Sequence, residues 1–184
     1  AEQLQDYRLS PSILDIGCGC GYGTAYLAEH VPDSRVQGVD ISADAISHAR
    51  KHFGAAAEFG LMGCIPLGKL FDVIVCLEVL EHQQNDAAFV RWLANHLRSG
   101  GIMLISVPNQ NATPCEKGLN PFHFRHYTPE SLEFVLAGAF LQVTKWFRQI
   151  GSEPGTCDVV SGRDGLAIVV VVQPGWKRYD NPVG

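Results

Sequence analysis

The side chains best suited to acid–base chemistry are gathered in the segment 120–127. It contains His123, Arg125, His126 and Tyr127. Because an unperturbed imidazole has a pKa of about 6.5, a histidine there can accept a proton from a hydroxyl group at neutral pH. We therefore predict that His123 acts as a general base.

His82 is a second candidate for the same chemistry, and it closes the sequence Glu78-Val79-Leu80-Glu81-His82. These residues follow an almost continuous apolar run over 71–77, which is typical of a parallel strand buried on both faces. Two interpretations of His82 stay open. It is either a base or orienting group for a reacting hydroxyl, or a histidine held by a hydrogen bond at the start of a helix.

The residues around His123 have their own alternatives. Arg125 would pair either with an anionic substrate or with Glu130 on the following helix. Phe122 and Phe124 are expected to pack the segment against the sheet.

The residues that could hold a ligand lie in a loop with glycine at every second position. Gly17, Gly19, Gly21 and Gly23 follow a short apolar strand, and a helix is predicted over 22–30. Without a Cβ, glycine adopts positive φ and lets a ligand lie against bare backbone. The free N–H groups at the helix start then face that ligand. Strand, glycine loop and helix together predict a nucleotide-binding βαβ unit.

Asp40 indicates what this loop would bind. It ends the second predicted strand, 25 residues after Asp15 at the end of the first. A carboxylate at that position can accept hydrogen bonds from both hydroxyls of a ribose, although an ordinary turn or capping acid is the alternative. The loop has no basic neighbour and no P-loop Lys-Ser/Thr pair, so the pattern disfavours a pyrophosphate and favours a ligand with an amino-acid moiety.

Alternating strands and helices would position these residues. Strands are predicted over residues 12–16, 36–39, 57–59, 71–77, 102–107, 140–149 and 166–173. Helices are predicted over residues 22–30, 43–53, 86–98 and 129–136, the second and fourth with N-caps at Ser42 and Thr128. The alternation favours an α/β fold with a parallel sheet, ending in an antiparallel pair joined by a glycine-rich loop. We expect one domain over residues 1–184, with its core at about 12–173 and a loose tail at 174–184.

Composition excludes several function classes. The net charge of −5 argues against a broad nucleic-acid surface. No apolar run reaches the roughly 20 residues of a membrane helix, and the first residues lack the apolar region of a signal peptide, so we expect a cytoplasmic protein. The six cysteines lack the spacing of a zinc site and are expected to be small buried residues.

Five stretches together resemble the class I S-adenosylmethionine-dependent methyltransferases. They are residues 14–23, 38–42, 71–82, 97–109 and 127–140. The resemblance spans about residues 12–173 in the family's order. It implies a Rossmann-like doubly wound sheet of seven strands, mostly parallel with a C-terminal antiparallel hairpin. It also implies S-adenosyl-L-methionine as the cofactor.

The same resemblance implies which residues bind the cofactor. They are Asp15, Gly17, Gly19, Gly21, Asp40, Ile41, Leu61, Met62, Leu77 and Glu78. The glycine backbone would follow the methionine part, with Asp15 near its amino group and Asp40 on the ribose. Ile41 would flank the adenine, whose edge would meet residues 61–62, and residues 77–78 would line the pocket floor. The stretch 60–66 lacks the acid that many relatives place on the adenine amino group, so adenine binding would rest on backbone and apolar contacts.

The acceptor of the methyl group is less well defined. The sequence at 120–123 and the aromatic strand ending at 149 resemble a subgroup linked to glycan and lipopolysaccharide assembly. We therefore expect O-methylation of a small molecule or sugar, with no nucleic acid and no metal ion. Only about 11 residues precede the first strand, so a lid ahead of residue 1 or a partner subunit is expected to close the site.

Two alternatives remain open. Glu78, Glu81 and His82, with a later histidine, also resemble the metal site of small-RNA 2′-O-methyltransferases, where two carboxylates and two imidazoles could hold a divalent ion. The acidic chain without a basic stripe argues against RNA. The other alternative is a non-catalytic cofactor-binding domain, which the intact glycine loop and Asp40 disfavour.

Overall fold

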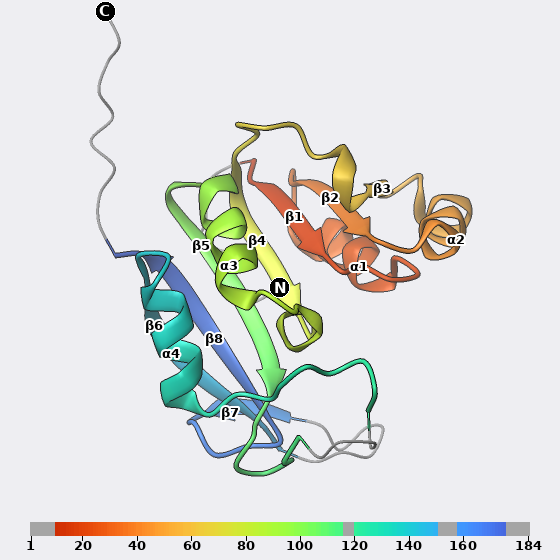
Figure 1. Cartoon of the computed structure of the whole chain (residues 1–184). Helices are drawn as coiled ribbons and strands as arrows, with labels where there is room; N and C mark the ends of the chain where they lie inside the picture. The colour runs from red at the N-terminus through yellow and green to blue at the C-terminus, as the bar shows by residue number, and fades with distance from the viewer. Residues whose placement is uncertain (1–9, 116–119, 151–157, 176–184) are drawn as a thin grey trace, which may run out of the picture.

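The computed structural model describes residues 10–115, 120–150 and 158–175, whose strands join in one eight-stranded sheet (Figure 1). Along the chain the elements are β1 (Ser12–Ile16), α1 (Tyr22–His30), β2 (Arg35–Asp40), α2 (Ala43–Phe53), β3 (Glu58–Leu61), the 3₁₀ turn η2 (Met62–Cys64), β4 (Phe71–Leu77), the 3₁₀ turn η3 (Leu80–His82), α3 (Asp86–His96), β5 (Leu97–Pro108), α4 (Pro129–Ala137), β6 (Leu141–Ile150), β7 (Asp158–Ser161) and β8 (Ala167–Pro174).

The strand order confirms the predicted fold class. Across the sheet the order is β3-β2-β1-β4-β5-β8-β6-β7. Strands β1 to β5 pair in parallel, whereas β8 is antiparallel to both β5 and β6. This is a Rossmann-like doubly wound sheet with an antiparallel C-terminal end. The order reverses between β1 and β4, and in such sheets ligands bind outside the carboxyl ends of the strands at this point.

The predicted number of seven strands is wrong by one. The extra strand, β7, pairs antiparallel with the end of β6, from Ile150 opposite Asp158 to Phe147 opposite Ser161. It offers only two adjacent apolar residues within a glycine-rich stretch. Such a short pattern does not distinguish a strand from a loop.

Two helices begin at the predicted caps, and one ends earlier than predicted. The Ser42 hydroxyl accepts from the N–H of Ala45 at 3.2 Å, and the Thr128 hydroxyl accepts from the N–H of Ser131 at 3.2 Å. The helix predicted to reach residue 98 ends at His96. Leu97 already pairs with β4, so sheet pairing overrides the helical pattern there.

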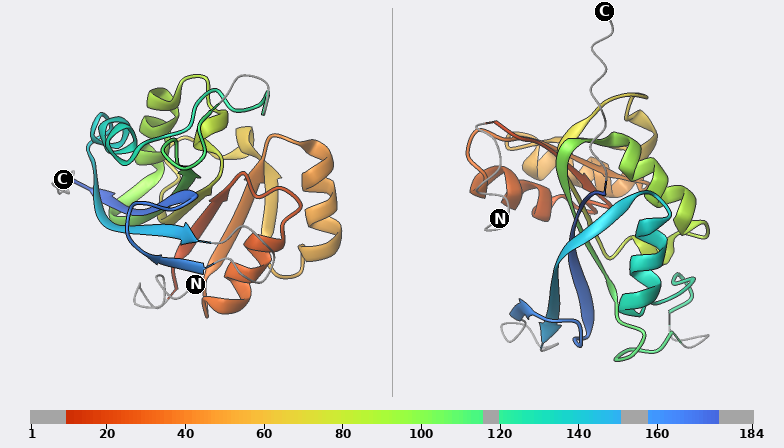
Figure 2. Two further views of the ribbon diagram at one scale, coloured as in Figure 1. Left: turned by 90° about the horizontal axis from the view of Figure 1, so that it is seen from below. Right: turned by 90° about the vertical axis from the view of Figure 1, so that its left-hand side faces the viewer.

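Helices cover both faces of the sheet. The two panels of Figure 2 show α3 and α4 on one face and α1 on the other, with α2 beside α1 near β3. Val90 and Leu93 of α3 and Leu132 and Leu136 of α4 are fully buried against the sheet. Leu80 of η3 belongs to the same core, so packing fixes the turn that follows β4.

Two expectations from composition can be compared with the described residues. None of the helices in these residues is long and apolar enough to cross a membrane. Cys18 and Cys76 are buried as expected, but Cys20 in the glycine loop and Cys64 at the end of η2 are exposed. The described ranges do not include Cys157, the expected lid, or residues 176–184 of the expected tail.

Candidate active site

The glycine loop after β1 has a backbone that only glycine adopts readily. Gly17, Gly19 and Gly21 have φ angles of 72°, 52° and 91°. A Cβ on Gly17 would stand 2.4 Å from Cγ2 of Val79, and one on Gly21 would stand 2.7 Å from Cβ of Ala49. Packing against the turn after β4 and against α2 therefore requires glycine at both ends of the loop.

Gly19 differs from its neighbours because the space beside it is open. A Cβ on Gly19 would meet nothing within 4 Å among the described residues. Its N–H donates to Oδ2 of Asp40 at 2.9 Å, while the N–H of Ser42 donates to Oδ1 at 2.8 Å. The half-buried carboxylate of Asp40 therefore lies directly beside Gly19, which forms the open crest of the loop.

Asp15 lies below the same loop and is almost fully buried. The hydroxyl of Thr24 donates to its Oδ2 at 2.6 Å. Burial raises the pKa of Asp15 to about 6; the Thr24 hydrogen bond lowers it, and the nearby Asp40 raises it further. Sequence reasoning missed Thr24, although a hydroxyl residue in the first turn of a helix after a glycine loop was the available signal.

Apolar side chains stand exposed at the carboxyl ends of β2, β3 and β4. Ile41, Leu61 and Leu77 are 82%, 45% and 44% exposed, and Leu61 pairs directly with Asp40. Met62 is half-buried and packs against the main core. Exposed apolar residues next to a carboxylate and a glycine loop suit a ligand with both polar and apolar parts.

Glu78 begins the turn after β4 in a strained conformation. Its φ is 54°, which is unusual for a residue other than glycine. Ser106 of β5 holds it there, because the Ser106 hydroxyl donates to Oε1 of Glu78 at 2.6 Å and the Ser106 carbonyl accepts from its N–H at 3.1 Å. Sequence reasoning missed Ser106, which comes close to Glu78 only through the pairing of β4 with β5.

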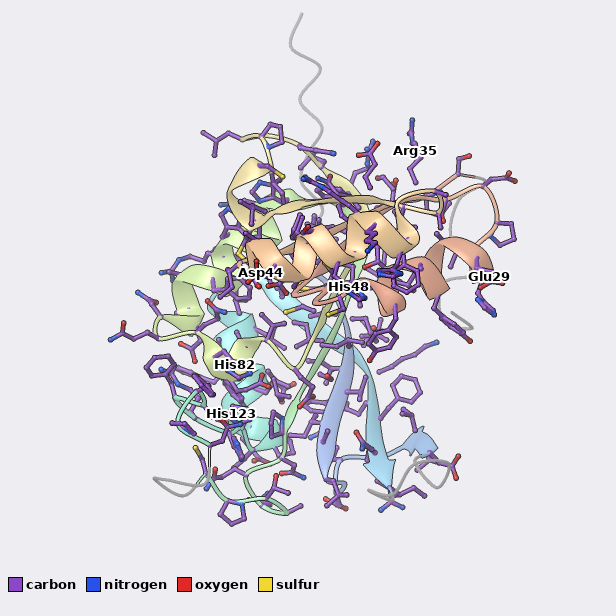
Figure 3. All side chains as sticks on the ribbon, turned by 90° about the vertical axis from the view of Figure 1, so that its right-hand side faces the viewer. Glu29, Arg35, Asp44, His48, His82 and His123 are labelled. Carbon is purple, nitrogen blue, oxygen red and sulfur yellow. The ribbon has the colours of Figure 1, made fainter. Side chains whose placement is uncertain are left out.

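The two predicted base candidates meet at the carboxyl edge of the sheet. Figure 3 shows His82 and His123 side by side, and their rings lie 4.6 Å apart in a T-shaped contact. Nδ1 of His82 donates to the carbonyl of Phe122 at 2.9 Å, and the N–H of Phe124 donates to the carbonyl of Glu81 at 2.9 Å. These bonds attach the segment after β5 to η3.

A second set of contacts anchors this segment and corrects one expectation. Arg125 pairs with Asp86 at the start of α3, not with Glu130, and also donates to the carbonyl of Gln84 at 2.9 Å. The hydroxyl of Tyr127 donates to the same Asp86 carboxylate at 2.9 Å. Asp86 is therefore the shared anchor, and it lies 39 positions before Arg125 in the sequence, beyond the reach of local pattern analysis.

The phenylalanines on either side of His123 do not pack against the sheet as expected. Phe122 is 71% exposed and Phe124 is 57% exposed. The polar bonds to η3 and α3 already hold the segment in place, so these rings remain free of the core. They flank the histidine at the edge where an acceptor would enter.

Burial also changes the protonation of the groups at this edge. The pKa of Glu81 is raised to about 7, mainly by burial and partly by the charge of Glu78, against a lowering by its own backbone N–H. Burial lowers the pKa of His123, and the nearby His82 and His126 lower it further. His123 is therefore held more strongly in its neutral form, in which one ring nitrogen has a free lone pair.

The profile of the family described as "Methyltransferase domain" matches residues 2–164. The chain belongs to the class I S-adenosylmethionine-dependent methyltransferases. A similar protein from Mycolicibacterium smegmatis, named "Probable S-adenosylmethionine-dependent methyltransferase", is 33% identical over 135 residues, covering 71% of this chain and 52% of the relative. The "Ubiquinone biosynthesis O-methyltransferase" of Glaesserella parasuis is 33% identical over 111 residues, covering 54% of this chain and 46% of the relative. This methyltransferase chain thus spans about half the length of these curated relatives.

Solved structures agree with the fold. A crystal structure of an S-adenosylmethionine-dependent methyltransferase from Clostridium acetobutylicum superposes with a TM-score of 0.72 at 15% identity. The match covers 95% of this methyltransferase chain and 89% of the other chain. At this identity the likeness establishes the shared architecture.

The residues of this methyltransferase fit its family's cofactor, S-adenosyl-L-methionine. The open crest at Gly19 leaves room for a ligand against the backbone, and Asp40 beside it offers carboxylate oxygens next to the loop. Asp15 supplies a buried acid near the loop. The exposed apolar residues at the ends of β2, β3 and β4 can pack against a purine ring.

Proposed function

We propose that this methyltransferase transfers the methyl group of S-adenosyl-L-methionine to an oxygen atom of a small-molecule or sugar acceptor. The observation that carries the proposal is the pair of imidazoles, His82 and His123, at the carboxyl edge next to the turn that packs on the glycine loop. The O-methyltransferase named for ubiquinone biosynthesis among its relatives supports oxygen as the atom that is methylated.

In the proposed mechanism the bound cofactor supplies an electrophilic methyl group, and this chain aligns it with the acceptor. The glycine backbone and Asp40 would hold the cofactor. Asp15 would hold its amino group, because a buried carboxylate and an ammonium stabilise each other. The exposed rings of Phe122 and Phe124 cover the acceptor from the side of the loop.

His123 removes the proton from the acceptor hydroxyl in this mechanism. The carbonyl of Thr113 can only accept, so Nδ1 of His126 carries the hydrogen of that bond. Nε2 of the neutral His126 ring then accepts from Nδ1 of His123, with 2.7 Å between the two nitrogens. Nε2 of His123 is left with a lone pair for the hydroxyl proton.

Methyl transfer from labelled S-adenosyl-L-methionine to a panel of phenols, hydroxy acids and sugars tests this proposal. We expect a labelled O-methyl ether with one of these classes, and His123→Ala should lower its turnover at least about tenfold. His48→Ala is the matched control, because His48 is an exposed histidine on α2 away from this edge (Figure 3). Labelled product on nitrogen, or full turnover by both His123→Ala and His82→Ala, would overturn the assignment.

A further inference from the structure

We propose that Glu81, His82 and His123 form a binding site for one divalent transition-metal ion. One carboxylate oxygen and one nitrogen from each imidazole all lie within 4.8 Å of one another. The three side chains come from η3 and from the segment after β5, which the hydrogen bond from Phe124 to the carbonyl of Glu81 ties together. The proposal replaces the expectation that the site uses no metal.

The first argument is that both imidazoles present a free lone pair. Nδ1 of His82 donates to a backbone carbonyl, that of Phe122, so its hydrogen is fixed there and Nε2 is unprotonated in the neutral ring. Nδ1 of His123 donates to His126, which in turn donates to the carbonyl of Thr113. Metal-binding histidines have this arrangement, in which the second ring nitrogen is held by a carbonyl or another acceptor.

The Glu81 carboxylate, the third ligand of the proposed site, is buried with its oxygens available to a cation. Its side chain is 1% exposed, and neither oxygen has a hydrogen-bond partner among the described residues. Its Oε1 lies 3.8 Å from Nε2 of His82, which is one of the two lone-pair nitrogens. A buried carboxylate without hydrogen bonds is costly, and a cation held between it and the two imidazoles would offset that cost.

The donor set selects the kind of ion. Two imidazoles and one carboxylate suit Mn²⁺, Fe²⁺, Co²⁺ or Zn²⁺, whereas Mg²⁺ and Ca²⁺ prefer oxygen ligands. Three protein ligands leave coordination positions for water and for an oxygen of the acceptor. This last step rests on the proposed function. A bound ion would lower the pKa of the acceptor hydroxyl. The two imidazoles would then be ligands, and His123 would act as the base only in the metal-free chain.

A titration of the metal-free chain with Co²⁺, followed by visible absorption and calorimetry, tests the site directly. His48 and His52 stack at 4.2 Å on α2, and two histidines four residues apart on a helix can chelate a metal ion by themselves. The titration is therefore done with His48→Ala/His52→Ala as the parent protein. We expect one equivalent of Co²⁺ to bind, with affinity reduced at least about tenfold in Glu81→Gln and in His123→Ala.

His30→Ala in the same parent is the matched control and should bind Co²⁺ normally, because His30 is exposed at the end of α1. Titration of the same samples with S-adenosyl-L-methionine reports on the fold and on the cofactor site, which these substitutions should leave unchanged. If Glu81→Gln does not fold, the half-exposed His123 carries the test. The proposal is overturned if the parent binds no Co²⁺, or if the Glu81 and His123 variants bind it as tightly as the parent. Cofactor binding without Co²⁺ binding would reject the metal site and leave the proposed function standing.

Discussion

The two sides of the proposed active site are built in different ways. The cofactor side consists of backbone and short-range contacts, as in the hydrogen bond from the N–H of Gly19 to Asp40 at the end of the next strand. The acceptor side consists of side chains from two segments about forty positions apart, joined by bonds such as those from His82 to Phe122 and from Arg125 to Asp86. The cofactor side is thus fixed by the sheet itself, whereas the acceptor side depends on how one long segment docks on η3 and α3.

This difference explains how a methyltransferase can keep one cofactor and change its acceptor. Replacing Phe124, Arg125 or Tyr127 alters contacts to η3 and α3 but leaves the pairing of β1 with β2 and β4 intact. Replacing a glycine of the loop alters the backbone on which the cofactor lies. The two sides should therefore respond separately to mutation, except at Gly17, which packs against Val79 in the turn between them.

The largest effect is expected at the crest of the glycine loop. In Gly19→Ala the new Cβ enters the open space assigned to the cofactor, and we expect affinity for S-adenosyl-L-methionine to fall at least about 100-fold. Gly68→Ala is the matched control, because Gly68 also has positive φ, at 81°, with nothing within 4 Å of a Cβ. Both variants should show similar loss of Tm in a thermal scan, and calorimetry should show weakened cofactor binding in Gly19→Ala alone. Equal cofactor affinity in the two variants would contradict the assignment of the loop.

A smaller loss is expected from the ribose contact. Asp40→Asn keeps an oxygen for the N–H of Gly19 but loses the charge that strengthens hydrogen bonds to the ribose, so affinity should fall between about tenfold and 100-fold. Asp44→Asn removes an exposed acid in the first turn of α2 and should bind the cofactor normally. A normal dissociation constant for Asp40→Asn in calorimetry would rule out the ribose role.

The third effect depends on pH. Asp15 must be ionised to pair with an ammonium group, and burial raises its pKa to about 6. Affinity for S-adenosyl-L-methionine should therefore be full above pH 7 and fall up to about tenfold per pH unit below pH 6. In Asp15→Asn this dependence should disappear and affinity should be low throughout. Parallel pH profiles for the two proteins would show that Asp15 does not face the amino group.

The smallest effect is expected from the anchor of the acceptor side. Arg125→Gln breaks the ion pair with Asp86 and loosens the segment that contains His123, so KM for the acceptor should rise about fivefold because the pair is partly exposed. Arg91→Gln changes another arginine, on α3, and is the matched control. Cofactor affinity should be normal in both. A loss of cofactor affinity in Arg125→Gln would show that the two sides are coupled.

The same contrast explains what could be predicted from the sequence. The parallel strands, the glycine loop and the position of Asp40 follow from apolar runs and from the residues that end them, and each run is a local signal. The caps at Ser42 and Thr128 are local signals and were also predicted correctly. β7 could not be predicted, because four residues of weak pattern become a strand only when β6 is present to pair with them.

On the acceptor side the residue types were visible but their partners were not. His82 and His123 stood out as imidazoles, yet their hydrogen bonds go to a backbone carbonyl and to His126. The Asp86 anchor and the burial of Glu81 arise from tertiary packing, which no spacing in the sequence encodes. The sequence therefore predicted which residues could act at this edge, but Glu130, one of the two partners considered for Arg125, was wrong.

The separation of the two sides is tested most directly by calorimetric titration with S-adenosyl-L-methionine. The proteins compared are the native chain, Gly19→Ala and the double variant His82→Ala/His123→Ala. We predict that the native chain and the double variant bind with the same dissociation constant, and that Gly19→Ala binds at least about 100-fold more weakly. The account is contradicted if the native chain gives no binding heat, or if the double variant loses cofactor binding as Gly19→Ala does.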